Sequence, residues 1–400
     1  MSQIALPAVF MRGGTSKGLF FHRRDLPADR AEWDALFLAA LGSPDPHGRQ
    51  LDGMGGGISS LSKVVVVSPS TRAGVDIDYL FGQVAVERAL VDYGSNCGNL
   101  TAAVGPFAVD EGLVQAADGE AALTLHNCNL DQRIDTRFEV ANGRAVVEGR
   151  AMLDGVSGQG APIRLSFLEP DGAVTGRLLP TGHAHDVLDV PGIGEIEATL
   201  IDASTALVIV RADTLGLSGV ELPDAIETDP ALVARLEAIR RAGAVVMGLA
   251  LETESVPKIG FVAPPANAPT LSGARLAADA VDLTARVVSM GRPHRALPLT
   301  AALALAAAAR TPGTLADKVA RPNASNPVRL GHPSGVAEVA VNLAAADPLH
   351  IARLTATRTA RRLMEGRVLV PAHRLTGRRI GHTHQAGPAV SNPSLGLKYQ

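Results

Sequence analysis

Short apolar runs separated by glycine-rich turns recur along the chain and predict a strand-rich fold. Apolar residues 5–10 and 19–21 flank a turn around Gly13-Gly14, which predicts a β-hairpin. Residues 28–41 instead carry apolar side chains three or four positions apart, and this spacing predicts a covering helix.

Two alanine-rich segments, about residues 98–112 and about residues 294–310, are apolar on nearly every face and predict buried helices. Each follows a polar turn. The first helix is expected to start at Cys97. The second is expected to open with three basic residues: Arg292, His294 and Arg295.

A weak internal repeat divides the chain. Residues 16–25 align with 204–213, and the segment that begins Ser62-Lys63 aligns, at nearly the same offset, with the one that begins Pro257-Lys258. We therefore expect an α+β protein made of two copies of one fold. The division predicts an N-terminal domain over 1–184, a C-terminal domain over 185–372 and a polar tail over 373–400.

The last part of the second copy has its own pattern. Residues 353–365 read as a turn followed by a helix, and residues 368–371 read as a closing strand.

Composition narrows the class of protein. A formal net charge of −3 without a basic cluster argues against a nucleic-acid partner. The longest apolar run, Ala301–Ala309, is too short to cross a membrane, and the first residues lack a signal-peptide pattern. With only two cysteines, the chain is not a secreted scaffold held together by disulfides, so we expect a cytoplasmic protein. The sequence leaves open whether the protein forms a homo-oligomer.

Cys97 and Lys63 are the candidate catalytic residues. A thiol at a helix N-terminus faces unpaired N–H groups and the positive end of the helix dipole, which favour a thiolate and any bound anion. Lys63 stands at the mouth of a buried strand, where apolar surroundings lower the pKa of a lysine and suit it to act as a base. The alternative is a snorkelling lysine at a strand end.

The turn with Thr15, Ser16 and Lys17 is a candidate anion site, because it combines N–H groups, hydroxyls and a cation. It lacks the spacing of a P-loop, and an ordinary Gly-Gly hairpin with solvated cations is the alternative. His126 and Cys128 form a potential metal pair. No third or fourth ligand follows at zinc-site spacing, so we expect a structural Cys128 and no metal.

Several motifs together resemble the PrpF family. They include Met-Arg-Gly-Gly-Thr-Ser-Lys-Gly (11–18), Gly-Ser-Pro-Asp-Pro (42–46), Asp-Gly-Met-Gly-Gly (52–56), Asn-Cys-Gly-Asn-Leu (96–100), Pro-Gly-Thr-Leu (312–315) and Gly-His-Pro-Ser-Gly (331–335). The resemblance covers about residues 6–372. It implies a fold similar to that of diaminopimelate epimerase, with two similar domains, each a β-barrel-like sheet around a central helix, and an active site between them.

The resemblance also implies an activity. The family includes 2-methylaconitate cis–trans isomerase of the methylcitrate cycle in propionate catabolism, 4-oxalomesaconate tautomerase and methylitaconate Δ-isomerase. Lys63 and Cys97 match the pair held to be catalytic in the isomerase. The epimerase uses two cysteines, one at each central helix, whereas the second helix here is expected to open with His294 and Arg295, which puts a two-thiol mechanism in doubt.

We therefore expect a cofactor-independent isomerase that moves an allylic proton of an unsaturated di- or tricarboxylate, above all 2-methylaconitate. The alternative within the family is 4-oxalomesaconate tautomerase or methylitaconate Δ-isomerase. Which of Lys63 and Cys97 is the first base stays open, and Lys258 is expected to be structural or to anchor substrate. Substrate binding is assigned to Thr15, Ser16, Lys17, Asn96, Gly98, Asn99, Arg292, His294 and Arg295. A binding protein that has lost its chemistry is the more distant alternative.

Overall fold

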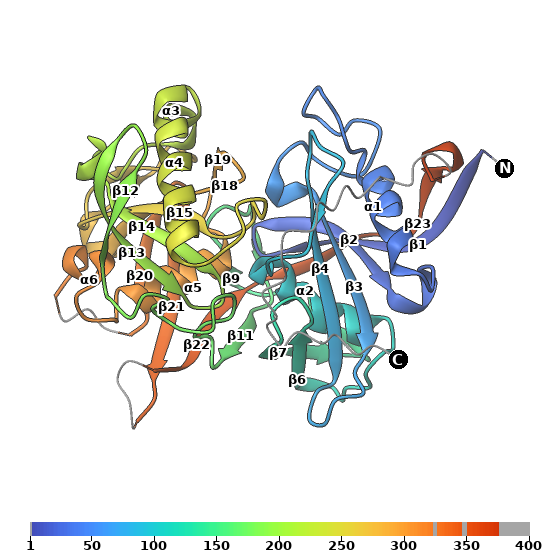
Figure 1. Ribbon diagram of the computed structural model, residues 1–400. Coiled ribbons are helices and arrows are strands. Elements are labelled where there is room, and N and C mark those ends of the chain that lie inside the picture. Colours follow the sequence, from blue (N-terminus) through green and yellow to red (C-terminus); the bar gives the residue numbers. More distant parts are fainter. Residues whose placement is uncertain (1, 323–325, 346–349, 376–400) are drawn as a thin grey trace.

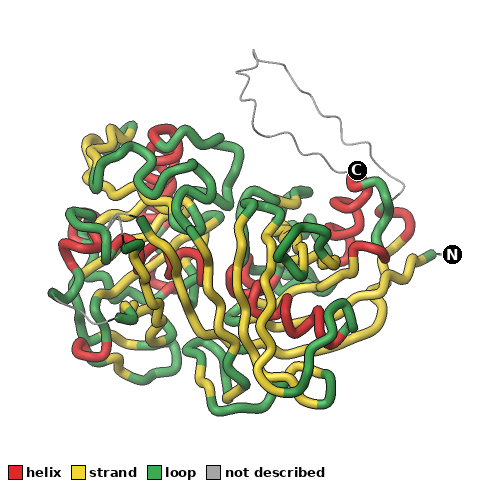
Figure 2. The backbone as a smooth tube through the Cα atoms, turned by 90° about the horizontal axis from the view of Figure 1, so that it is seen from below, coloured by secondary structure: helices red, strands yellow, loops and turns green. Residues whose placement is uncertain are grey.

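The computed structural model describes residues 2–322, 326–345 and 350–375. Two lobes lie side by side in Figure 1, and strands run through both of them, as Figure 2 shows from below. Most of the predicted polar tail lies outside the described residues; its first two residues belong to the short 3₁₀ turn Ala372–Arg374.

The first lobe is built from the hairpin, a covering helix and a sheet around one buried helix. Its main elements are β1 (Gln3–Gly13), β2 (Ser16–His22), α1 (Trp33–Leu41), β3 (Lys63–Pro69), β4 (Ile77–Val84), β5 (Val91–Asp92), α2 (Gly98–Asp110), β6 (Gly119–Asn127), β7 (Gln132–Ala141), β8 (Arg144–Ala145) and β11 (Ile163–Leu168). A small separate hairpin joins β9 (Ala151–Met152) to β10 (Gln159–Gly160).

The second lobe repeats this plan with additional helices. Its elements are β12 (Asp186–Val190), β13 (Gly194–Asp202), β14 (Ala206–Arg211), α3 (Pro223–Glu227), α4 (Pro230–Val246), β15 (Lys258–Ala263), β16 (Ala268–Pro269), β17 (Arg275–Leu276), β18 (Leu283–Ser289), β19 (Arg292–Pro293), α5 (Leu299–Ala308), α6 (Leu315–Val319), β20 (Val328–His332), β21 (Gly335–Leu343) and β22 (Ile351–Arg358).

The strand pairings follow the same order in both lobes. In the first, β2 pairs parallel with β3, β3 antiparallel with β4, β4 parallel with β6 and β6 antiparallel with β7. In the second, β14, β15, β18, β20 and β21 repeat the series parallel, antiparallel, parallel, antiparallel. The repeat predicted from the sequence is therefore a repeat of topology.

The final strand returns to the first lobe. β22 pairs with β11, and β23 (Ala360–Pro371) runs antiparallel along the whole of β1. The division predicted from the sequence assigns residues 360–371 to the C-terminal domain. In the structure these residues complete the sheet of the first lobe.

The helix predicted within residues 353–365 is wrong. These residues form most of β22 and the first half of β23, because a continuous ladder of backbone hydrogen bonds to β11 and β1 outweighs the weak helix preference of their side chains.

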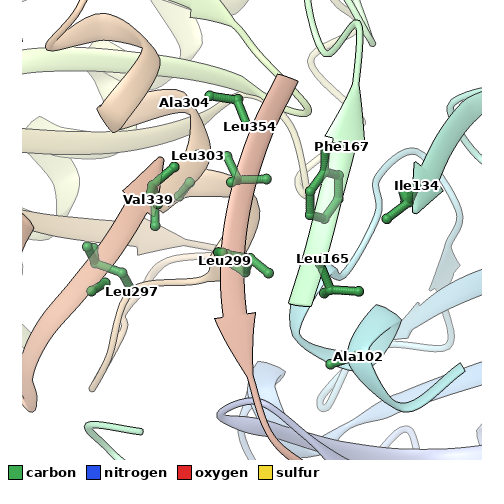
Figure 3. Close-up of a cluster of buried hydrophobic side chains, with 14 of the residues drawn as sticks. Ala102, Ile134, Leu165, Phe167, Leu297, Leu299, Leu303, Ala304, Val339 and Leu354 are labelled. Carbon is green, nitrogen blue, oxygen red and sulfur yellow. The ribbon is translucent and has the colours of Figure 1, made fainter. Parts of the chain in front are cut away.

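The two predicted buried helices are present. α2 begins at Gly98 and is buried except at its last residue, and every residue of α5 is buried. Both belong to one hydrophobic cluster that continues through β11 and β22, where Leu165 and Leu354 lie between the helices (Figure 3). α5 starts at Leu299, later than expected, because Arg292 and Pro293 pair with β18 and Pro298 caps the helix.

The predicted covering helix over residues 28–41 is present but shorter than expected. The covering helix is α-helical only from Trp33, after a 3₁₀ turn, and ends where Gly42 takes a left-handed φ of 80°. None of the helices in the described ranges has the length and apolar character needed to cross a bilayer.

Candidate active site

The N-termini of α2 and α5 meet between the lobes. A Cβ atom added to Gly98, the first residue of α2, would lie 3.1 Å from the side chain of Leu299, the first residue of α5. Cys97 caps α2 and Pro298 caps α5, so the two helices present one thiol where they approach each other. At the start of α2, the N–H groups of Gly98 and Asn99 have no carbonyl of their own helix to bond.

The glycine-rich turn packs directly on this helix end. Asn99 Nδ2 donates to Thr15 Oγ1 over 3.0 Å, and the Cys97 sulfur lies 3.9 Å from Ser16 Oγ. Gly14 makes this contact feasible: its φ is +50°, and a Cβ there would fall 2.2 Å from Asn99 Oδ1. The turn therefore places the Ser16 hydroxyl beside the thiol and the Thr15 hydroxyl on Asn99.

Lys63 is buried at the start of β3. Its Nζ donates to Oε1 of Gln83, 2.5 Å away, and Gln83 is its direct partner across the β3–β4 ladder. The Gln83 amide is oriented by its own donation to the carbonyls of Ser59 and Ser62. Burial lowers the pKa of Lys63, while electrostatic and hydrogen-bond interaction with Cys97 opposes the shift. The lysine and the cysteine line the same cavity, so the charge of Cys97 acts on Lys63.

The second lobe adds two basic groups. Lys258, at the start of β15, donates to the Ser255 carbonyl over 2.9 Å, and burial together with the charge of Lys63 lowers its pKa to about 8. His294 is half-buried, and its partial removal from solvent with the charges of both lysines lowers its pKa to about 3, so its ring is neutral at pH 7. Mutual repulsion among these groups marks a site suited to a multiply charged anion.

One cavity of about 40 Å³ unites these groups. Of the residues predicted from the sequence, it is lined by Thr15, Ser16, Lys63, Asn96, Cys97, Gly98, Asn99 and His294. This volume is about three times the minimum that holds one water molecule. A larger groove of about 460 Å³ shares four of its lining residues: Ser59, Gln83, Ser289 and Met290.

Three predicted substrate-binding residues do not line the cavity. Lys17 follows Ser16 in β2, so its side chain points to the opposite face of the sheet. Its Nζ lies 5.5 Å from the ring centre of Phe10. Arg292 pairs with Glu87 at 3.3 Å, and Arg295 pairs with Asp224 at 2.9 Å. The two arginines are each about half exposed.

Ion pairs join the lobes at the mouth of the larger groove. Arg88 pairs with Glu254, and Glu87 with Arg292, each across the two lobes. The groove beside these pairs shares residues of both lobes with the inner cavity, so the two hollows adjoin each other where the lobes meet.

Several lining residues were missed in the sequence, among them Gln83, Ser255, Ser289 and Thr300. Gln83 carries no local signal, because its role depends on the register of β3 and β4. Thr300 could have been predicted from the sequence. It is the second residue of α5, as Asn99 is of α2, so an alignment of the two helix starts identifies it.

Comparison with known proteins gives a consistent result. A family model described as "PrpF protein" matches residues 3–371. The 2-methyl-aconitate isomerase of Shewanella oneidensis is 42% identical over 387 residues, covering 92% of this chain and 98% of that protein. A crystal structure of a methylitaconate-delta-isomerase is 38% identical, with a TM-score of 0.77 over 96% of this chain and 100% of that chain.

A more distant likeness concerns the fold alone. A hydroxyproline epimerase from Agrobacterium vitis shares 13% identity with this chain and a TM-score of 0.52, over 92% of this chain and 93% of that one. The epimerase-like α+β fold expected from the sequence is confirmed.

Proposed function

The chain belongs to the PrpF family and is an isomerase, and from this premise we propose that it interconverts the cis and trans forms of 2-methylaconitate, without a cofactor, by moving an allylic proton. The 42% identity to a 2-methyl-aconitate isomerase supports this substrate. We place the reaction in the cytoplasm, where a reducing environment protects a reactive thiol.

The observation that carries the mechanism is that Lys63 and Cys97 line the same cavity at the start of α2, where Cys97 acts on the pKa of Lys63. In the reactive form one member of the pair is unprotonated and the other carries its proton. The unprotonated member removes the allylic proton, and the electron pair of the C–H bond moves into the conjugated system as a dienolate. Rotation follows while the double bond is relaxed, and a proton returns to carbon from the pair.

The remaining groups stabilise charge. Gly98 and Asn99 line the cavity at the helix N-terminus, where unpaired N–H groups and the helix dipole favour developing enolate charge. With a pKa of about 8, Lys258 is mostly protonated at pH 7 and offers a cation to a substrate carboxylate. Neutral His294 offers one N–H donor.

The test uses paired variants of the full-length protein. Cys97→Ser and Lys63→Ala are each expected to lower kcat for 2-methylaconitate by at least about a thousandfold while the circular dichroism spectrum is kept. The matched controls are Cys128→Ser, the other thiol, and Lys318→Ala, an exposed lysine of α6; both should keep kcat. Retention of near-wild-type activity by either site variant contradicts the mechanism.

Assays of the same protein on three substrates test the substrate assignment independently of the catalytic mechanism. We expect kcat/KM to be highest for 2-methylaconitate among 2-methylaconitate, 4-oxalomesaconate and methylitaconate. Faster turnover of another of the three would replace the substrate and leave the Lys63–Cys97 chemistry standing. No turnover of any would favour a binding protein.

A further inference from the structure

Strands β4 and β6 bring a carboxylate, an imidazole and a thiol together. Asp78 of β4 and His126 of β6 are direct partners in the parallel ladder, and Cys128 follows β6 with its N–H bonded to the Tyr79 carbonyl. Asp78 Oδ1 lies 3.2 Å from His126 Nδ1, and the Cys128 sulfur lies 3.7 Å from the same nitrogen. Ligand atoms of the three residues all lie within 4.8 Å of one another.

These separations fit a tetrahedral zinc ion. Zinc–nitrogen, zinc–oxygen and zinc–sulfur bonds of about 2.0, 2.1 and 2.3 Å in a tetrahedron hold nitrogen about 3.4 Å from oxygen and about 3.6 Å from sulfur. The measured values of 3.2 and 3.7 Å agree with these edges. Carboxylate, imidazole and thiolate are also the three ligand types that zinc accepts, and a water molecule can take the fourth position.

The next shell of contacts has the form found around metal ligands. Asp131 Oδ1 lies 2.7 Å from Nε2 of His126, and Ser70 Oγ donates to Asp78 Oδ1 over 2.9 Å. A carboxylate on the remote ring nitrogen is the usual partner of a metal-bound histidine. The Arg72 guanidinium approaches Asp78 at 3.7 Å, but it is half exposed and free to turn to water.

Both ring nitrogens of His126 face carboxylate oxygens. A neutral imidazole carries a single N–H and can donate to only one of them. With that N–H on Nε2 toward Asp131, Nδ1 is an acceptor that faces both the Asp78 carboxylate and the Cys128 sulfur. A thiolate-binding metal ion placed among these three atoms would bond to all of them.

We propose that Asp78, His126 and Cys128 form a zinc-binding site distinct from the catalytic cavity. Asp78 points to the face of β4 opposite Tyr79, whose hydroxyl contacts Asn96 and Thr101 beside the catalytic thiol. The ion would tie β4 to the loop that follows β6 and would stabilise the sheet rather than enter the reaction.

Cobalt provides a direct probe, because thiolate-bound Co²⁺ has a charge-transfer absorption in the near ultraviolet. The chain has two cysteines, so Cys97→Ser leaves Cys128 as its single thiol. Titration of the metal-free, full-length Cys97→Ser protein with Co²⁺ should produce this absorption at one ion per chain, and Zn²⁺ should displace it. Adding Cys128→Ser should abolish it. Absorption by the wild-type protein but not by Cys97→Ser would overturn the proposal, as would no binding of either ion.

A second pair of variants tests the geometry without touching a ligand. Asp131→Asn should weaken Zn²⁺ affinity about 10- to 100-fold, because it removes the carboxylate that orients His126. Glu120→Gln changes an exposed carboxylate on β6, the strand that carries His126, and should leave affinity unchanged. Zn²⁺ should raise the Tm of Cys97→Ser but not that of Cys97→Ser/Cys128→Ser. Equal affinity of Asp131→Asn and wild type contradicts the site.

Discussion

Lys63 and Gln83 face each other across the β3–β4 ladder, with the lysine Nζ donating to the amide oxygen over 2.5 Å. A neutral amide accepts this bond without adding a negative charge, so the lowering of the Lys63 pKa by burial is not cancelled by an ion pair. Gln83 thus holds Lys63 in position without placing a charge beside it.

The first prediction replaces this amide by a carboxylate. In Gln83→Glu a negative charge beside Lys63 should raise the pKa of the lysine, so the acid limb of the kcat/KM profile should move to higher pH and activity at pH 7 should fall about tenfold or more. The measurement is kcat/KM against pH for both proteins. Gln159→Glu, an exposed glutamine of β10, is the control. A profile that falls in height without moving along the pH axis would remove Lys63 as the titrating base.

The second prediction concerns substrate binding by Lys258. Because its pKa is about 8, the charge of Lys258 should be lost as the pH rises through about 8, and KM for the tricarboxylate should increase there. Lys258→Met should raise KM at pH 7 about 10- to 100-fold, with a smaller effect on kcat, and should abolish the increase in KM above pH 8. Steady-state kinetics between about pH 6.5 and 9.5 measure both effects. A fall in kcat at constant KM would make Lys258 a proton-transfer group instead.

The third prediction is acid sensitivity from a buried histidine outside the cavity. Burial with the charges of Arg358 and Arg286 lowers the pKa of His332 to about 3, and its Nδ1 accepts from the Ser334 N–H. Between pH 3 and about 6.5 the unfolded chain binds a proton that the folded chain does not, so stability falls as the pH falls through this window.

For one such histidine the loss of unfolding free energy between pH 7 and pH 5 is about 2 kcal/mol. Urea unfolding should show that His332→Gln reduces the difference between the two pH values by about that amount. His47→Gln, at an exposed position, should not. The same pH dependence in His332→Gln and wild type would show that this histidine does not cause it.

The fourth prediction tests how the glycine-rich turn meets α2. Gly14→Ala places a methyl group 2.2 Å from Asn99 Oδ1 at a residue with φ of +50°, so it combines backbone strain with a clash. Gly74→Ala has a similar φ of +70° with no atom within 4 Å, and isolates the strain. Gly74→Ala should cost about 1 kcal/mol of stability and keep activity.

Gly14→Ala should cost about 2 kcal/mol more than its control and lower kcat/KM, because Asn99 and the start of α2 must shift. Chemical unfolding and steady-state kinetics measure the two effects. Equal losses in the two variants would mean that the turn adapts without moving the helix.

Elements whose signal lies within a few consecutive residues are readable from the amino-acid pattern alone. Glycines around residue 13 and the apolar pattern beside them specify the first hairpin, and the uniformly apolar segments specify α2 and α5 as buried helices. The repeat of Lys63 in Lys258 indicated two lobes, and strand pairing bears this out. The position of Cys97 at a helix N-terminus was also readable, because a helix start depends on neighbouring residues.

Relations between distant strands, in contrast, arise only when the whole chain folds. The register of β3 against β4 places Gln83 on Lys63, the parallel pairing of β4 with β6 places Asp78 beside His126, and the return of β23 to β1 turns a predicted helix into a strand. Lys17, Arg292 and Arg295 lie away from the cavity for the same kind of reason, since strand register and surface ion pairs set where they point. Local preference is a property of a few consecutive residues, whereas strand pairing depends on contacts that exist only once the whole chain has folded.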